Sequence, residues 1–227
     1  MILLIDDANI ERIKQIYNYY PIDGVTTNPS ILAKYGRKPY DALLEIRDFI
    51  GNRAQLHAQV LSRTAEEMVE EGRKIEQMLG NNTFVKIPTI PEGLKAMKIL
   101  SSEGYHITAT AIYTPMQAYL AAKAGAEYAA PYVNRIDNLG NDGITTTKKM
   151  QDIYVRNGLK TKLLAAGFKN SQQVQELCEY GVQAVTVASD VIENFIKNAC
   201  VTSAVDDFIA DFEKLCGPGK TMLNCED

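Results

Sequence analysis

The chain has 227 residues, of which 46% are hydrophobic and 23% are charged, and its formal net charge at pH 7 is −4. This length and composition are typical of a soluble globular protein with a sizeable core, and one domain is the simplest organisation. The 24 Lys and Arg residues are scattered and are outnumbered by 28 acidic residues, so we expect no nucleic-acid partner.

The first residues of the chain do not resemble a targeting signal. It reads MILLI before Asp6 and Asp7, without a basic residue, and this apolar run is shorter than the core of a secretory signal. No later apolar run approaches the roughly 18 residues of a membrane-spanning helix. We therefore expect a cytoplasmic protein with no membrane partner.

The residue types that bind metals or redox cofactors are not grouped in the sequence. The four cysteines form no CxxC pair, and His57 and His106 each stand alone in an apolar run. Neither a GxGxxG nor a GxxxxGK[ST] string follows an early strand-like segment. We predict reduced thiols, no metal and no cofactor.

Short β-rich segments alternate with segments whose apolar residues recur at helical spacing. The predicted strands are 2–5, 24–27, 55–60, 83–87, 106–111, 128–133, 162–166 and 184–187. The predicted helices are 8–19, 40–50, 64–79, 91–103, 114–124, 143–157, 171–180 and 191–198. A further amphipathic stretch at 204–215 has no strand of its own.

This alternation predicts the fold class. Eight strand–helix units in about 200 residues favour a single closed (β/α)8 TIM barrel with an extra C-terminal helix, and an open doubly wound sheet is the alternative. We expect the barrel at 1–200, the extra helix at 201–216 and a flexible tail at 217–227.

Lys86 lies in the middle of the apolar segment TFVKIP, residues 83–88. Burying an ammonium costs several kcal/mol unless it is paired, and the usual response is a lowered pKa that leaves a nucleophilic amine. The alternative is structural: the lysine lies at an exposed strand end or pairs with a carboxylate.

Polar residues also end or closely follow five other predicted strands, the first, second, third, fifth and sixth, and in a barrel these ends converge on one mouth. They are Asp6, Thr26, Asn28, Gln59, Thr110, Tyr132, Asn134 and Arg135. Singly, each has an ordinary structural explanation, such as a helix N-cap for Asp6 or a turn for Asn28-Pro29. Together they would surround Lys86.

Four motifs resemble the transaldolase family, and its short branch containing the fructose-6-phosphate aldolases is the most similar. They are GVTTNPS at 24–30, VKIP at 85–88, AEYAAPYVNRID at 126–137 and AAGFK at 165–169. They follow the family's order along nearly the whole chain. The resemblance implies that Lys86 is a Schiff-base lysine acting on a sugar phosphate, or a related anionic ketose, and an aldehyde, without a metal.

The resemblance also implies catalytic roles for other strand-end residues. Gln59, Thr110 and Tyr132 would hold a catalytic water, with Tyr132 as the acid/base partner. Aldolase members resemble this chain in having glutamine and tyrosine where transaldolases tend to have glutamate and phenylalanine. The pair Gln59 and Tyr132 therefore favours an aldolase, with a transaldolase as the alternative.

Substrate-binding residues follow from the same resemblance. Asp6 would act with Thr26 and Asn28 to orient the three-carbon unit and Lys86. The remaining predicted substrate-binding residues are Asn134, Arg135, Gly167 and Lys169. In the family, the residues at positions 135 and 167 bind the substrate's terminal phosphate. Arg135 offers a planar fork that suits a tetrahedral oxyanion.

The chain departs from the family pattern near this phosphate end. Gly167 stands where relatives commonly have a serine, and VASD at 187–190 stands where they usually show a proline. These two changes leave two interpretations open: neutral drift with the same sugar phosphate, or a reshaped anion pocket for a group such as the sulfonate of a 6-sulfo ketose. Separately, Asp7 replaces a threonine that is frequent after the first-strand aspartate.

The C-terminal helix resembles the family's subunit-swapping arm. This resemblance implies a homo-oligomer, for which a ring-based decamer is one arrangement.

Overall fold

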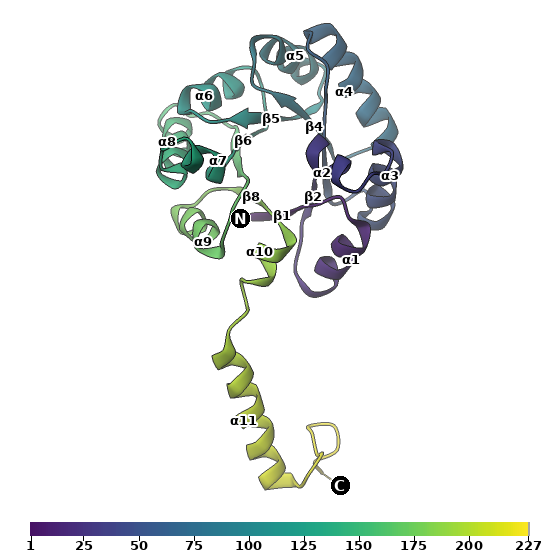
Figure 1. Ribbon diagram of the computed structural model, residues 1–227, viewed down its shortest axis with the longest axis vertical. Helices are drawn as coiled ribbons and strands as arrows, with labels where there is room; N and C mark the ends of the chain where they lie inside the picture. The colour runs from purple at the N-terminus through teal and green to yellow at the C-terminus, as the bar shows by residue number, and fades with distance from the viewer. Residues whose placement is uncertain (227) are drawn as a thin grey trace. The chain divides into compact units, whose positions relative to one another are not determined.

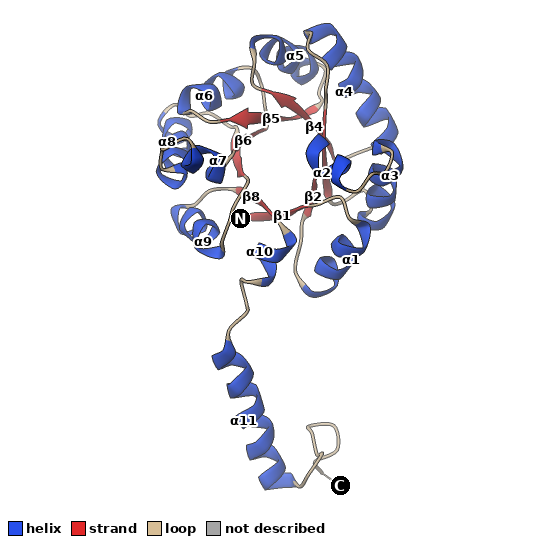
Figure 2. Ribbon diagram, in the orientation of Figure 1, coloured by secondary structure: helices blue, strands red, loops and turns tan. Residues whose placement is uncertain are grey.

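Residues 1–226 are described by a computed structural model of the chain, which divides into two compact units with the boundary in the sequence between Ile192 and Glu193. In the first unit, eight parallel strands pair in sequence order and close into a barrel. Helices surround the ring of strands (Figures 1 and 2). The predicted (β/α)8 barrel is confirmed.

The strands are β1 (Ile2–Asp6), β2 (Gly24–Thr26), β3 (Gln55–Gln59), β4 (Thr83–Pro88), β5 (His106–Ile112), β6 (Tyr128–Pro131), β7 (Lys162–Ala165) and β8 (Ala184–Val187). The helices are α1 (Ile10–Tyr19), α2 (Pro29–Lys34), α3 (Pro39–Ile50), α4 (Ala65–Leu79), α5 (Pro91–Ser102), α6 (Pro115–Lys123), α7 (Val133–Asn138), α8 (Gly143–Arg156), α9 (Ser171–Tyr180), α10 (Ser189–Glu193) and α11 (Ala199–Cys216). Each predicted strand therefore exists, with ends that differ by at most two residues.

Two helices, α2 and α7, have no counterpart among the predicted helices. The Asn28-Pro29 pair, interpreted as a turn, begins α2, because the Asn28 side chain accepts the N–H of Ile31 and Pro29 occupies the first turn. The short helix α7 was also not predicted.

The predicted helix at 191–198 is wrong. The helix there, α10, ends at Glu193, and Asn198 caps the start of α11 by accepting the N–H of Cys200. The α11 helix is accordingly longer than the predicted 204–215 and begins inside the range assigned to the barrel.

Strand alternation explains how a lysine comes to lie inside the barrel. In β4, Val85 and Ile87 belong to the large core between strands and helices, whereas Phe84 belongs to a second cluster inside the barrel. That inner cluster contains Leu4, Phe84, Tyr128, Ala130, Leu164 and Ala184. Lys86 follows Phe84 by two residues, so it points to the same inner side, nearer the C-terminal mouth.

The end of β5 is irregular. The β5–β6 register shifts between Ala109 and Ile112, and Ala111 has a φ of 58°. A non-glycine residue in this conformation is uncommon and costs on the order of 1–3 kcal/mol, and such bulges redirect neighbouring side chains. The bulge directly follows Thr110, one of the predicted site residues.

The second unit contains α11, which is amphipathic. Its apolar side chains Val201, Val205, Phe208 and Ile209 are all exposed within the described chain. In residues 1–226, no helix is both long and apolar enough to cross a membrane.

A close backbone contact joins β4 to α5, the helix that follows the lysine strand. A Cβ placed on Gly93 would lie 1.9 Å from the carbonyl oxygen of Pro88. Backbone cannot give way cheaply at such a distance, so only glycine fits here.

We predict that Gly93→Ala lowers the free energy of unfolding by about 1–3 kcal/mol, because overpacking outweighs the better helix propensity of alanine. Gly72→Ala in α4 is the matched control, since its Cβ would meet the movable Cδ1 of Leu100, at 2.7 Å. Urea unfolding of both variants measures the difference. Equal stability of Gly93→Ala and wild type would contradict the close packing.

Candidate active site

A small cavity of about 80 Å³ opens at the C-terminal ends of the strands. Its walls come from strands β1, β2, β4, β6, β7 and β8 and the segments that follow them. It is lined by Asp6, Thr26, Asn28, Lys86, Ala130, Tyr132, Arg135, Leu164, Ala166, Gly167 and Thr186. This is the position at which barrel enzymes carry their chemistry.

Lys86 is 5% exposed and lies at the floor of this mouth. Its Nζ donates a hydrogen bond of 2.7 Å to the carbonyl oxygen of Thr27. Burial lowers the pKa of Lys86, and the nearby Asp6 carboxylate partly opposes this. The structural alternatives for Lys86 were an exposed strand end or an ion pair with a carboxylate. Neither applies, because the lysine is buried and has no ion-pair contact within 4 Å among the described residues.

Asp6 is held by hydroxyl groups rather than by a cation in direct contact. Thr26 Oγ1 donates to Asp6 Oδ1 at 2.7 Å, and the Oγ1 atoms of Thr26 and Thr186 are 2.6 Å apart. Desolvation raises the pKa of Asp6, whereas Lys86 and the Thr26 hydrogen bond lower it. The carboxyl therefore depends on its neighbours to stay ionised.

Thr110 and Tyr132 form a direct pair across β5 and the end of β6. Thr110 Oγ1 lies 2.7 Å from the Tyr132 hydroxyl oxygen. Tyr113 packs edge-on against the Tyr132 ring, with ring centroids 5.8 Å apart. The predicted meeting of Thr110 and Tyr132 is therefore present in the geometry.

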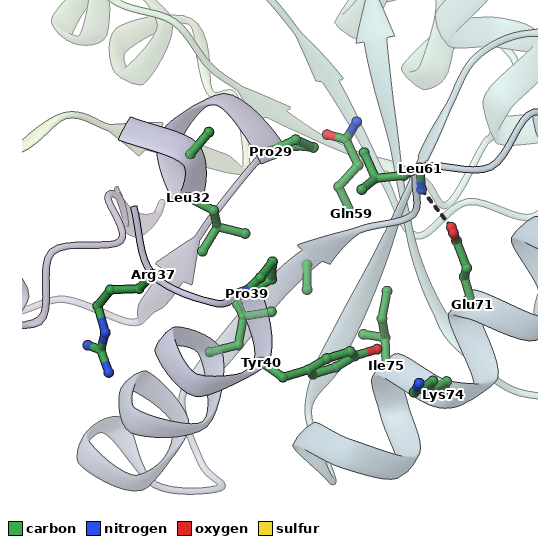
Figure 3. Close-up of a pocket in the computed structure, with 13 residues that line it drawn as sticks. Pro29, Leu32, Arg37, Pro39, Tyr40, Gln59, Leu61, Glu71, Lys74 and Ile75 are labelled. Carbon is green, nitrogen blue, oxygen red and sulfur yellow. Dashed lines mark hydrogen bonds between the residues drawn. The ribbon is translucent and has the colours of Figure 1, made fainter. Parts of the chain in front are cut away.

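Gln59 is the register partner of Lys86 on β3, but its side chain bonds to neither Thr110 nor Tyr132. It lines a larger, mostly apolar cavity of about 420 Å³ between β3 and helices α2, α3 and α4. Figure 3 shows Gln59 beside Pro29 at the edge of this cavity. The backbone after Gln59 is held by Glu71, which accepts the N–H of Leu61 at 2.6 Å.

The phosphate end of the predicted site contains Arg135 and Gly167. The guanidinium of Arg135 lies over the Tyr132 ring, 4.6 Å from its centroid, and donates to the Tyr113 hydroxyl at 3.4 Å. Gly167 has a φ of 72°, and the nearest atom to a Cβ placed there is 4.0 Å away. The position has room for a side chain but a backbone conformation that favours glycine.

The structure brings together seven of the predicted site residues: Asp6, Thr26, Asn28, Lys86, Tyr132, Arg135 and Gly167 line the cavity. Thr110 reaches it through Tyr132, and Gln59 lies in the neighbouring cavity. Asn134 and Lys169 are not among its lining residues, and Lys169 is exposed.

Two of the residues that line the cavity, Asn28 and Thr26, have polar atoms that already form hydrogen bonds within the protein. The Asn28 oxygen caps α2, which leaves its amide N–H groups for a ligand. The hydroxyl hydrogen of Thr26 goes to Asp6, so this hydroxyl can offer a ligand only a lone pair.

Four other residues that line the cavity were not predicted from the sequence: Ala130, Leu164, Ala166 and Thr186. A signal for Thr186 was present, because it is the single polar residue in the apolar segment AVTV of β8, as Lys86 is the single charged residue in β4. Within residues 1–226, no group of three or more His, Cys, Asp or Glu residues is arranged to hold a metal ion.

A closed (β/α)8 barrel with a buried lysine at its C-terminal mouth defines an enzyme of the class I aldolase and transaldolase type. The family model described as Transaldolase/Fructose-6-phosphate aldolase matches residues 3–219. The chain belongs to this family.

One similar protein comes from Streptococcus pneumoniae and is named "Probable fructose-6-phosphate aldolase". It is 39% identical over 213 residues, which cover 93% of this chain and 96% of the relative. The similarity therefore extends over both proteins almost completely.

We predict that Asp6→Asn lowers the pKa of Lys86 further, because the Asp6 carboxylate is the group that raises it. The pH dependence of Lys86 modification by an amine-selective reagent, measured by peptide mass spectrometry, should have its midpoint below 10.5 in wild type and lower still in the variant. Exposed lysines in the same samples are the internal control. A midpoint that stays constant or rises would contradict the coupling.

Proposed function

We propose that the protein is a class I aldolase that cleaves or forms fructose 6-phosphate through a dihydroxyacetone enamine on Lys86. The observation that carries the proposal is the buried lysine, with its lowered pKa, in one cavity with Asp6 and Tyr132. The name of the pneumococcal relative supports the choice of substrate.

The first step is attack by the neutral Lys86 amine on the C2 carbonyl carbon of the ketose. The hydrogen bond from Nζ to the Thr27 carbonyl supports this step, because it uses an N–H and leaves the nitrogen lone pair free. Proton transfer gives a carbinolamine, and loss of its hydroxyl group as water gives an iminium ion.

The second step breaks the bond between C3 and C4. The C4 hydroxyl loses its proton to a water that we place against Tyr132 and Thr110, whose oxygens are 2.7 Å apart. The C3–C4 bonding electrons move to the iminium, which becomes a neutral enamine, and glyceraldehyde 3-phosphate leaves as the aldehyde. Asp6 faces the nitrogen and stabilises its positive charge before cleavage.

The fate of the enamine separates the two activities of the family. Protonation at C3 followed by hydrolysis releases dihydroxyacetone and completes an aldolase cycle. Attack of the enamine on a second aldehyde completes a transaldolase cycle. The glutamine and tyrosine at positions 59 and 132 favour the aldolase, and Gln59 would act from the side of the neighbouring cavity.

We place the substrate's terminal anion between Arg135 and Gly167. In the described chain, the N–H groups of Gly167 and Phe168 donate no hydrogen bond to protein, so both are available to anionic oxygens. These donors could replace part of what the family's serine hydroxyl supplies. A 6-sulfo ketose remains the second candidate substrate because the position lacks that hydroxyl.

Product analysis with fructose 6-phosphate, with and without erythrose 4-phosphate, tests the activity. We expect free dihydroxyacetone in both reactions, and borohydride should trap a dihydroxyacetone adduct on Lys86. Lys86→Met should lose both signals, whereas Lys123→Met, on the outer helix α6, should keep them.

Three results would contradict parts of this proposal. An adduct that survives Lys86→Met would rule out the lysine. Sedoheptulose 7-phosphate without free dihydroxyacetone would assign a transaldolase. Faster cleavage of 6-deoxy-6-sulfofructose than of fructose 6-phosphate would assign a reshaped anion pocket.

We also propose that this enzyme works in the cytoplasm as a homo-oligomer, with α11 packing on a neighbouring subunit. The exposed apolar stripe of α11 supports this, since such a surface is normally covered. A ring-based decamer is one such assembly. Phe208→Asp should convert the assembly into smaller species, as measured by sedimentation velocity. Ser203→Asp, on the opposite side of the helix, should leave it intact; a wild-type monomer would contradict the proposal.

A further inference from the structure

Thr186 is a buried polar residue at the C-terminal end of β8, 3% exposed, that faces the same cavity as Lys86. Its Oγ1 lies 2.6 Å from Thr26 Oγ1, and Thr26 Oγ1 lies 2.7 Å from Asp6 Oδ1. Three neighbouring strands, β8, β1 and β2, thus contribute one residue each to a continuous chain of oxygens.

The direction of these hydrogen bonds follows from counting hydrogens. An ionised carboxylate can only accept, so the single hydroxyl hydrogen of Thr26 points to Asp6. Thr26 must then accept from Thr186, and the order is Thr186 to Thr26 to Asp6. If Asp6 gains a proton, the carboxyl can donate to Thr26 and the order can reverse.

We propose that Thr186 is a positioning residue that acts through Thr26 to hold Asp6 as an ionised acceptor facing Lys86. This inference rests on the proposed function, in which a negative Asp6 stabilises the cationic nitrogen on the path to the iminium. Donation from Thr186 polarises the Thr26 hydroxyl and strengthens its bond to Asp6. Both threonines are β-branched and sit on barrel strands, so little freedom remains in their orientation.

The charged groups around Asp6 act on its ionisation in opposite directions, so the hydrogen bond from Thr186 to Thr26 can affect the balance. Lys86, from β4, attracts its negative charge, whereas the adjacent Asp7 repels it. Asp7 is itself fixed by the N–H groups of Ala8 and Asn9 and by the Ser189 hydroxyl at 2.9 Å. Tyr132 and Arg135 are the other titratable side chains that line the cavity. Burial opposes ionisation of Asp6, and the threonine chain counteracts burial.

Removal of the Thr186 hydroxyl should therefore raise the pKa of Asp6. Since the ionised form is the active one, the acidic limb of kcat/KM should move to higher pH. We expect a shift of about half to one pH unit and a fall in kcat/KM of about three- to tenfold on that limb. At high pH, where Asp6 is ionised in both proteins, the loss should be smaller.

The experiment compares wild type, Thr186→Val and Thr186→Ser in the full-length protein. Valine has the shape of threonine without the hydroxyl, and serine keeps the hydroxyl. The pKa of Asp6 is measured in the free protein by carbon-13 NMR of labelled aspartate carboxyls, with Asp6→Asn used for assignment. The pH profile of fructose 6-phosphate cleavage is recorded in parallel, and Thr186→Ala replaces the valine variant if that variant does not fold.

The expected result is a raised pKa of Asp6 in Thr186→Val and a value close to wild type in Thr186→Ser. Combining Thr26→Val with Thr186→Val should add little to Thr26→Val alone, because Thr186 acts through Thr26. An unchanged pKa of Asp6 in Thr186→Val, or full additivity of the two substitutions, would overturn the inference. Since the NMR titration does not require turnover, a failure of the proposed aldolase activity would be recognised separately, in the wild type.

Discussion

The structure around the mouth of the barrel depends on the burial of one amine. Lys86 occupies an inward position on a strand whose outward residues, Val85 and Ile87, pack in the main core, so it cannot reach solvent by turning outward. On the same inner side lies the cluster with Phe84, none of whose members hydrogen-bonds to Lys86. The remaining polar partners come from the strand ends: the Thr27 carbonyl accepts a hydrogen bond, and Asp6 supplies a negative charge. Desolvation outweighs that charge, and the amine is biased towards its neutral form.

Desolvation and a nearby opposite charge also compete in setting the pKa of Asp6. A carboxylate in direct contact with Lys86 would form an ion pair and hold the lysine protonated. Instead, the Thr26 hydroxyl of β2 binds Asp6, and the Thr186 hydroxyl of β8 contacts Thr26. The charge of Asp6 acts on Lys86 without a contact within 4 Å. In the proposed mechanism, this arrangement would keep an acidic group available to stabilise a cationic nitrogen while the free amine remains a nucleophile. The hydroxyl groups of Thr26 and Thr186 therefore contribute, together with the charged residues, to the electrostatic environment of Asp6.

Two cavities are lined by residues of the β3–β4 pair, Gln59 in one and Lys86 in the other, and they differ in polarity. The cavity of about 80 Å³ contains Asp6, Lys86 and Arg135, whereas the cavity of about 420 Å³ is lined mainly by apolar side chains of β3 and helices α2 to α4. Chemistry that moves protons and binds an anion needs the charged cavity, despite its smaller volume. Gln59 lines the larger cavity only, although it is the strand partner of Lys86 on β3.

Much of the fold was determined by the sequence itself, because strand and helix periods are local properties: eight alternating units predicted the barrel, and an isolated lysine in an apolar segment predicted an unusual amine. Local turn chemistry was misjudged where a capping asparagine begins a helix, at Asn28 and Asn198. Only the tertiary structure decided the bulge at Ala111, the location of Gln59 beside a second cavity and the contact between Thr26 and Thr186. Those two threonines are 160 positions apart in the chain, and the closure of β8 onto β1 brings them together. Contacts of that kind depend on strand register around the whole barrel, which no local pattern of residues encodes.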